Sequence, residues 1–326
     1  MVLALKQIPC GLGILAAFST NSKSRMAVKI PYRRELSFEY GQCETISPNI
    51  RRVVAQNPSP FTLYGTGTYI LGHGEVAVID PGPADPAHIQ ALVDALEGET
   101  ITHVLVTHTH MDHSPGCALL KEHRNAPTYA YGPHGAGKIA EGVQVEEGGD
   151  MDFTPDHEVR HGDVIEGGNW SVECVYTPGH TSNHMCFQLR EERALFTGDH
   201  VMGWSTSIVS PPDGDMHAYM QSLELLLERD DALYWPTHGP AITEPKEHVR
   251  AFIAHRQERE AQIRDCLKQG YSRIADMVPV MYVDTPEFMY PAAGRSVYAA
   301  LEYMMARGVV TCEGEPGLEA AYQLTA

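Results

Sequence analysis

The sequence predicts an α/β protein in which a layered sandwich is followed by a smaller, mainly helical unit. Three observations lead to this fold class. Short apolar runs rich in β-branched residues alternate with amphipathic stretches in two successive halves between residues 50 and 245, as in sheets that are covered by helices. Several of these runs end in loops that carry histidine or aspartate. After Pro245 the pattern changes to long, charged helical segments, which indicates a second unit.

The elements of the first part follow from composition and capping signals. A proline stands in the first turn of the helix expected over residues 86–97. Ser114 and Pro115 are expected to open the helix over 114–124, as its N-cap and first helical residue. The amphipathic pattern of residues 216–228 predicts a third helix. Strands are predicted over residues 52–55, 68–71, 76–80, 101–107, 128–131, 170–176, 184–189, 194–197 and 232–235.

The C-terminal part is expected to be a small winged-helix-like domain. A long charged helix over residues 245–268 leads into two shorter helical stretches, and two strand-like runs then flank a Glu-Gly-Glu-Pro-Gly turn. The interleaved arginines and glutamates of the long helix are expected to form a solvated face.

We therefore expect an extension over 1–25, a catalytic sandwich over 26–250 and the winged-helix-like domain over 251–326. The portion of this domain over residues 271–326 is short for an independent core. It should dock on the sandwich through the helix over 245–268 and wall one side of the cleft.

Composition limits the classes of function. The chain has 326 residues and a formal net charge of −18, so binding to a phosphate backbone or an anionic membrane would need a local basic patch. Its seven cysteines form no Cys-x-x-Cys pair, which argues against a disulfide framework and fits reduced thiols in a cytosol. No sequence stretch approaches the length of a membrane span. We expect a cytoplasmic protein with no membrane partner.

The first 25 residues allow three interpretations. They contain no acidic residue, and Pro9, Gly11 and Gly13 interrupt their weak apolar run. The segment could be a poor secretory signal, an organelle presequence, or the result of an overlong translation start before Met26. We favour the last, because the sequence from Met26 already has the character of a folded domain.

The segment VTHTHMDHSPG, residues 106–116, gathers three histidines and an aspartate directly after a predicted strand. His108 and His110 are two residues apart, so they can project from the same side of extended backbone, whereas the adjacent Asp112 and His113 point in different directions. One short loop thus offers two pairs of ligands, more than a single metal ordinarily needs. The loop predicts two metal ions, with zinc favoured by imidazole and carboxylate ligands and manganese or iron as alternatives.

Three further loops complete the ligand set. His180 lies in TPGHTSNH, Asp199 in LFTGDH and His238 in YWPTHGP, and in each case an apolar strand runs into a loop rich in glycine or proline. Loops at one edge of a sheet can converge on a shared site.

These four motifs, in this order, resemble those of the metallo-β-lactamase superfamily over roughly residues 50–245. The resemblance implies an αβ/βα sandwich with the active site at one edge of its sheets. It also implies that one metal is bound by His108, His110 and His180, that the other is bound by Asp112, His113 and His238, and that Asp199 bridges the two.

Within the superfamily, the segments NPSPFTLYGTGTYILG and TPGHTSNHMCF and the C-terminal tail resemble the subgroup that contains lactamase-beta-like protein two. The chain departs from that subgroup at Gly67, where asparagine is frequent, and over residues 200–220. Both places are expected to line the pocket, so the resemblance says least about the substrate.

Other side chains are candidates for supporting roles. Asp80 is expected to orient a ligand imidazole from outside the coordination sphere. His184 is expected either to support the site or contact substrate, or else to pack within its strand. Tyr64, Trp204 and Ser205 are candidates for the mouth of the pocket.

Four conspicuous residues are expected to be structural. His103 should lie on a sheet face, and His200 should point away from the metals. Gly65 and Gly67 should form a turn, because neither a helix start nor a lysine follows them as a phosphate-binding loop requires.

The ligand set predicts a dinuclear zinc-dependent hydrolase in which a metal-bound hydroxide attacks the substrate, with Asp112 and Asp199 as catalytic carboxylates. The acidic net charge favours a small acyl substrate: an ester, thioester, lactone or β-lactam. The tail and the subgroup favour the alternative, an endoribonuclease acting on single-stranded RNA. A non-enzymatic binding module is disfavoured by the complete ligand set. The sequence does not predict the oligomeric state.

Overall fold

The computed structural model describes residues 28–137 and 148–325. The extension expected over residues 1–25 lies outside this part of the chain. Two stacked β-sheets form the centre of the main domain, and the core between them includes Tyr69, Ile79, Phe187 and Phe196, all almost fully buried. The apolar runs of the sequence therefore form the interior of a sandwich.

The first sheet has seven strands in the order β1 to β7. Its first four strands are antiparallel neighbours, and β4, β5, β6 and β7 run parallel to one another. The strands are β1 (Glu44–Ser47), β2 (Ile50–Val54), β3 (Gly67–Leu71), β4 (Glu75–Ile79), β5 (Thr100–Leu105), β6 (Thr128–Ala130) and β7 (His157–Glu158).

The second sheet has five strands in the order β12-β11-β10-β9-β8. Only β11 and β12 are parallel. The strands are β8 (Val164–Glu166), β9 (Ser171–Tyr176), β10 (Met185–Leu189), β11 (Ala194–Gly198) and β12 (Leu233–Pro236). Parallel strands end at the same edge of a sheet, so β11 and β12 deliver their following loops to one place.

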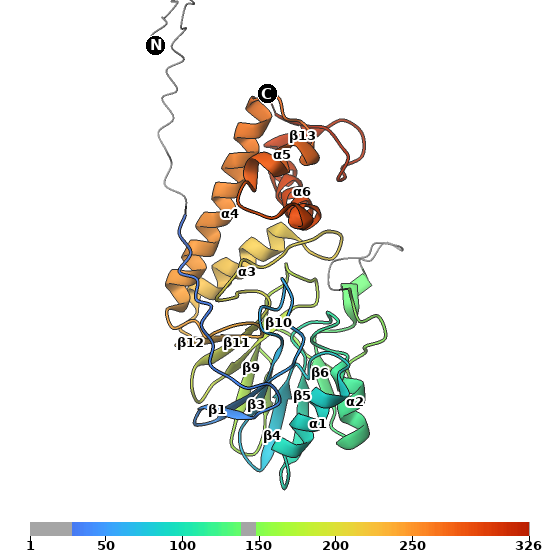
Figure 1. The fold of residues 1–326 in the computed structure, drawn as a ribbon, viewed down its shortest axis with the longest axis vertical. Coiled ribbons are helices and arrows are strands. Elements are labelled where there is room, and N and C mark those ends of the chain that lie inside the picture. The colour runs from blue at the N-terminus through green and yellow to red at the C-terminus, as the bar shows by residue number, and fades with distance from the viewer. Residues whose placement is uncertain (1–27, 138–147, 326) are drawn as a thin grey trace, which may run out of the picture.

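Helices cover both outer faces, which confirms the predicted αβ/βα sandwich (Figure 1). The first sheet is covered by α1 (Pro86–Ala95) and α2 (Gly116–His123), and the second by α3 (Met216–Glu228) and the first half of α4 (Pro245–Lys268). Asp85 caps α1 by accepting from Ala87 N at 2.9 Å. The helices of residues 28–137 and 148–325 are all too short or too polar to be candidates for a membrane span.

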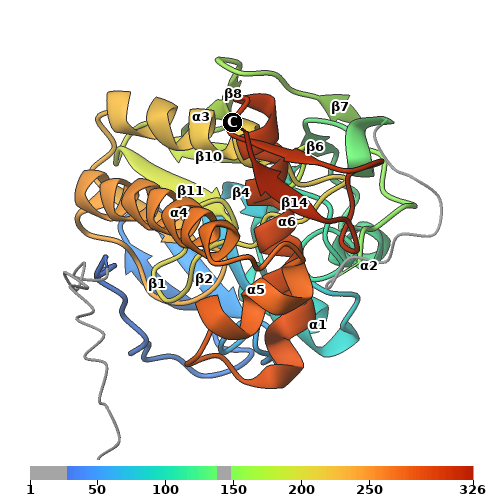
Figure 2. The same cartoon turned by 90° about the horizontal axis from the view of Figure 1, so that it is seen from above.

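The C-terminal unit is a winged helix that rests on the end of α4 (Figures 1 and 2). It consists of α5 (Ile274–Met281), the short 3₁₀ helix η2 (Glu287–Met289), α6 (Tyr290–Ala306) and the hairpin β13 (Val310–Cys312) and β14 (Tyr322–Leu324). Its core includes Ile263 and Cys266 of α4, so it docks through this helix as the sequence predicted. The expected boundary at residue 250 falls inside α4, where Val249 and Phe252 pack against the sandwich.

The structure differs from the sequence prediction in a few local elements. Strands β1, β7 and β8 are short, and most of their residues are at least partly exposed, so they carry no apolar run that would reveal them. A second 3₁₀ helix, η1, spans His134–Gly137. The prediction of Ser114 as an N-cap is wrong. Helix α2 begins at Gly116 without a side-chain cap, and the Ser114 hydroxyl donates to Asp150 Oδ2 at 2.7 Å.

Candidate metal centre

The predicted ligands lie together at one edge of the sandwich. His108, His110, Asp112 and His113 follow β5, and His180 lies in the loop between β9 and β10. Asp199 follows β11, and His238 follows β12. All seven side chains are buried. Strand ends from both sheets therefore bring the four sequence motifs into a single site.

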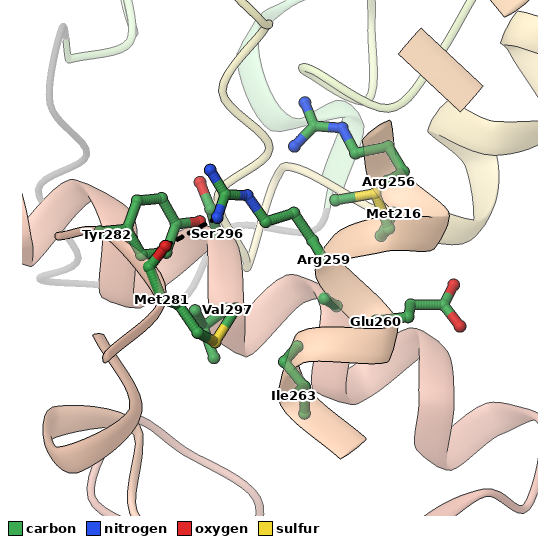
Figure 3. A pocket seen from close by; sticks show the side chains of 10 residues that line it. Met216, Arg256, Arg259, Glu260, Ile263, Met281, Tyr282, Ser296 and Val297 are labelled. Atoms are coloured by element: carbon green, nitrogen blue, oxygen red, sulfur yellow. Dashed lines mark hydrogen bonds between the residues drawn. The ribbon is translucent and has the colours of Figure 1, made fainter. Parts of the chain in front are cut away.

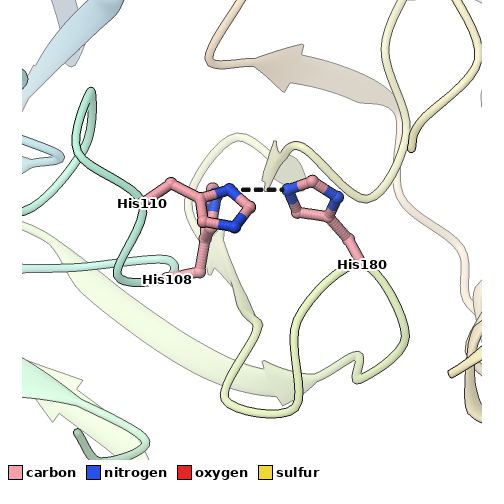
Figure 4. Close-up of side chains that lie close together, drawn as sticks. All are labelled: His108, His110 and His180. Atoms are coloured by element: carbon pink, nitrogen blue, oxygen red, sulfur yellow. Dashed lines mark hydrogen bonds between the residues drawn. The ribbon is translucent and has the colours of Figure 1, made fainter. Parts of the chain in front are cut away.

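Three imidazoles face one another in the first cluster (Figure 4). His110 Nδ1 lies 3.1 Å from His108 Nε2 and 3.1 Å from His180 Nε2. Ligand atoms around a tetrahedral zinc ion, with bonds of about 2.0–2.1 Å, lie about 3.3 Å apart. These two distances are close to that spacing, and the three ligand atoms lie near enough to one another to hold one ion.

A second cluster combines imidazole with carboxylate. Asp112 Oδ2 lies 3.1 Å from His238 Nε2 and 3.5 Å from His113 Nε2. These ligand atoms are all close enough to hold one ion. The second cluster therefore offers a harder donor set than the first.

Asp199 stands between the two clusters. Its Oδ1 lies 3.6 Å from His113 Nε2 and 3.4 Å from His238 Nε2, and its Oδ2 lies 3.8 Å from His180 Nε2. One oxygen faces each cluster, so the carboxylate lies between the two sets of ligand atoms.

Hydrogen bonds at the far side of the rings orient three of the imidazoles. His113 Nδ1 lies 2.9 Å from Asp80 Oδ2, His180 Nδ1 lies 2.6 Å from the Ile208 carbonyl oxygen, and His238 Nδ1 lies 3.1 Å from the Gly65 carbonyl oxygen. With Nδ1 donating to these acceptors, Nε2 is left as the ligand atom. Asp80 thus occupies the position expected of a supporting residue.

His184 lies behind Asp199. Its Nε2 accepts from the backbone N–H of Asp199 at 3.2 Å, and its Nδ1 lies 3.0 Å from the Thr177 hydroxyl. The ring is fully buried and is absent from the residues lining the main cavity. Of the alternatives left open by the sequence, its position favours support of the Asp199 loop over contact with substrate.

Charge is distributed unevenly over the site. Burial opposes charge on His238, but Asp199 and Asp112 raise its pKa to about 10. Burial and the neighbouring imidazoles instead hold the pKa of His108 and of His110 well below the ordinary value. One side of the site thus attracts a cation, and the other presents neutral nitrogen ligands.

Unpaired atoms support the same assignment. Among the described residues, Asp112 Oδ2, His113 Nε2, Asp199 Oδ1 and His238 Nε2 are buried without a hydrogen-bond partner. Buried polar atoms rarely lack a hydrogen bond, and here each of the two nitrogens lies 3.1–3.6 Å from both oxygens without forming one. The donor set fits divalent metal ions.

A cavity with a volume of about 730 Å³ opens onto the clusters. It is lined by His180 and Asp199 together with Trp204 and Ser205, the two mouth candidates. Tyr64 is absent from the lining and packs against Phe38 with ring centroids 5.6 Å apart.

Of the two places expected to line the pocket, the segment over residues 200–220 lines this cavity and Gly67 does not. Gly67 does not line this cavity, and its backbone N–H donates to the Thr237 carbonyl at 2.8 Å. Residues of the 200–220 segment do line it, Met202 and Ser207 among them.

The two histidines expected to be structural lie away from the metal ligands. His103 packs on Tyr129 and Trp170, with ring centroids 4.9 and 5.1 Å away. His200 packs on Tyr219 at 4.8 Å. The sequence reasoning did not identify Phe61, Arg256 and Arg259 as cavity residues, since no motif marks them.

Comparison with protein families agrees with the geometry. Residues 62–238 match the family described as "Metallo-beta-lactamase superfamily", and residues 274–318 match "Beta-lactamase associated winged helix domain".

Individual relatives share most of the chain. A Beta-lactamase-like protein 2 homolog from Caenorhabditis elegans is 31% identical over 276 residues, which cover 82% of this chain and 88% of the relative. The Lactamase-like protein adaB from Aspergillus niger is 32% identical, covering 76% and 77%. A Cryptosporiopsis protein named Atrochrysone carboxyl ACP thioesterase dmxR1 is 34% identical, covering 71% and 66%.

Solved structures support the fold. A Beta-lactamase domain protein from Burkholderia ambifaria superposes with a TM-score of 0.73 at 20% identity, covering 89% of this chain and 96% of the other. A metallo-beta-lactamase family protein from Thermus thermophilus gives a TM-score of 0.70 at 21% identity, covering 86% and 100%.

Proposed function

Because the chain belongs to the metallo-β-lactamase superfamily, we propose that it is a dinuclear zinc hydrolase of small acyl substrates, thioesters first among them. The observation that carries the proposal is the cavity of about 730 Å³ that His180 and Asp199 line. Small-molecule sites typically measure about 300–1,000 Å³. The name of the Cryptosporiopsis relative, an acyl-carrier-protein thioesterase, supports an acyl substrate.

The predicted ligands would form two metal sites. His108, His110 and His180 would hold one ion, Asp112, His113 and His238 the other, and Asp199 would bridge them. Bound there, the ions would lower the pKa of a water to supply the nucleophile and would polarise the acyl carbonyl. Asp199 lines the cavity, so its carboxylate can orient the nucleophile. The Asp80 carboxylate holds the His113 ring in place.

Burial of the site favours hydrolysis by a water molecule held in the site over reaction with bulk water. Buried side chains surround the ligands, and the indole of Trp204 lines the cavity beside them. Where side chains exclude water, the electrostatic interactions of the reacting groups become stronger.

We also propose that the protein is cytoplasmic. The six cysteines among the described residues are free thiols, which supports this location.

Metal content tests the dinuclear part of the proposal. We expect protein produced with added zinc to contain close to two equivalents per chain, because both clusters present a full set of ligand atoms. Elemental analysis after gel filtration measures this directly. An Asp112→Asn variant should retain about one equivalent, because it damages the second cluster alone. A wild-type content of one equivalent or less would contradict the dinuclear assignment.

A substrate panel tests the reaction. One zinc-loaded preparation should hydrolyse a thioester, and it should be compared on a lactone, nitrocefin and a single-stranded RNA. The winged-helix domain favours RNA as the second candidate substrate, because such domains often contact nucleic acid. RNA cleavage that falls steeply with added salt, in the absence of acyl hydrolysis, would replace our proposal with the endoribonuclease.

A further inference from the structure

Two arginines of α4 line the same cavity as the metal ligands. Arg256 and Arg259 are three residues apart, so they are neighbours on one face of the helix, and both contribute to the lining that includes His180 and Asp199. Figure 3 shows both guanidinium groups extending from the same side of α4, that of Arg259 toward Tyr282 and Ser296. A positive wall therefore belongs to the cavity that two of the predicted metal ligands, His180 and Asp199, line.

Arg256 is buried without an opposite charge. It is only 7% exposed, and its guanidinium carbon lies 5.1 Å from the centre of the Tyr219 ring. One nitrogen donates to the Ser207 carbonyl, but Nε has no hydrogen-bond partner within the described ranges. Buried arginines are ordinarily paired with a carboxylate, and none pairs with this one among the residues that the structure describes.

Arg259, which is half-buried, also has no opposite charge paired with it among the described residues. Its Nη1 donates to the Gln262 amide oxygen at 2.8 Å and to the Met281 carbonyl at 2.9 Å. Its guanidinium carbon lies 4.3 Å from the centre of the Tyr282 ring. In the part of the chain that is described, its Nε is again without a partner. Neutral groups thus hold the side chain in position and leave its charge uncompensated.

Two acidic residues of this helix near the arginines have other partners, although Glu258 also lines the cavity. Glu260 pairs with Arg307, and Glu258 accepts the backbone N–H of Val28 at 3.0 Å. Burial and the two arginines together lower the pKa of His255 to about 3, in keeping with a positive potential at this wall. Asp284, also in the lining, is exposed to solvent.

We propose that Arg256 and Arg259 form an anion subsite that binds a carboxylate or phosphate of the substrate while its acyl group lies at the metal centre. Guanidinium groups match the paired oxygens of both anions. The subsite rests on the proposed function and narrows it to acyl substrates that carry a negative charge. The charge could stand on the acyl half, as a carboxylate, or on the thiol half, as a phosphate.

Three thioesters with the same acyl length distinguish these sources. One is neutral, one carries a terminal carboxylate on the acyl half, and one carries a phosphate on the thiol half. Arg259→Met should raise KM on the order of tenfold for the charged thioester that uses the subsite, since the variant removes a charge-assisted hydrogen bond to the anion. Its kcat, and both constants for the neutral thioester, should change little.

Matched variants separate charge from fold. Arg250→Met removes an exposed arginine of the same helix that lies outside the cavity lining, and it should leave every KM unchanged. Arg259→Lys should recover part of the affinity. Equal changes in KM for neutral and charged thioesters, or no change for any, would overturn the subsite.

A binding measurement keeps the test independent of turnover. If wild-type enzyme hydrolyses no thioester, the proposed function fails, and calorimetric titration with 4′-phosphopantetheine and with glutarate still tests the subsite. Binding that Arg259→Met weakens and Arg250→Met leaves intact supports it. If neither anion binds, the subsite is overturned. It is also overturned if an anion binds in Arg259→Met as in the wild type but not in His110→Ala, because the anion would then be bound by the metals.

Discussion

Replacing His110 with alanine is expected to abolish hydrolysis and leave the protein folded. His110 Nδ1 lies 3.1 Å from the ligand atoms of both His108 and His180, so its loss opens the first cluster. A metal site supplies most of the activation of the water, and we expect kcat/KM to fall on the order of a thousandfold or more. Steady-state kinetics with the accepted substrate, together with elemental analysis, measure the loss of activity and the loss of metal.

The matched control is His103→Ala. His103 is also an imidazole of the β5 region, but it packs on Tyr129 and Trp170 rather than among the ligands. It should retain activity within a few fold after correction for any loss of folded protein, as judged by circular dichroism. Similar activity losses in the two variants would show that folding, not metal binding, accounts for the effect of His110→Ala.

The metal site was accessible to sequence reasoning because its ligands stand in compact motifs at strand ends. His108, His110, Asp112 and His113 fall within six residues, and β5 before them is marked by its β-branched residues. The two helices with the clearest signals, α3 and α4, have the bounds that were predicted. Strong local patterns therefore determine both the scaffold and the ligands.

Packing between distant segments could not be predicted from the sequence. Alternating Arg and Glu over α4 predicted a solvated face, yet Arg256 is buried, in contact with the Ser207 carbonyl and the Tyr219 ring of α3. Arg256 and Arg259 line the cavity beside the metal ligands only because segments far apart in the chain come into contact. The same is true of His184, whose contact with the Asp199 backbone joins two different loops.

Asp80→Asn is expected to weaken zinc binding by about 10–100-fold, the range typical for groups that orient a metal ligand. Asp80 is completely buried. Its Oδ1 accepts from Thr107 N at 2.7 Å. Its Oδ2 accepts from the hydroxyls of Thr107 at 2.7 Å and of Thr237 at 3.1 Å. The same oxygen lies 2.9 Å from His113 Nδ1. This one carboxylate joins the ends of β4, β5 and β12 to the second cluster. Asparagine suits the backbone, which has φ 48° at this position, a conformation that Asn tolerates better than alanine does.

The variant separates the charge of Asp80 from its shape. An amide nitrogen in place of Oδ2 would face the donors of His113 and Thr237 instead of accepting from them, so the His113 ring would lose its orientation. We also expect the free energy of unfolding of the metal-free protein to fall by about 1–3 kcal/mol, the cost of leaving buried donors unpaired. Competition with a chelator measures zinc affinity, and denaturant titration measures stability. Asp94→Asn, on the exposed face of α1, should change neither quantity. If zinc affinity is unaltered in both Asp80→Asn and Asp94→Asn, the surroundings of His113 hold its ring without this carboxylate.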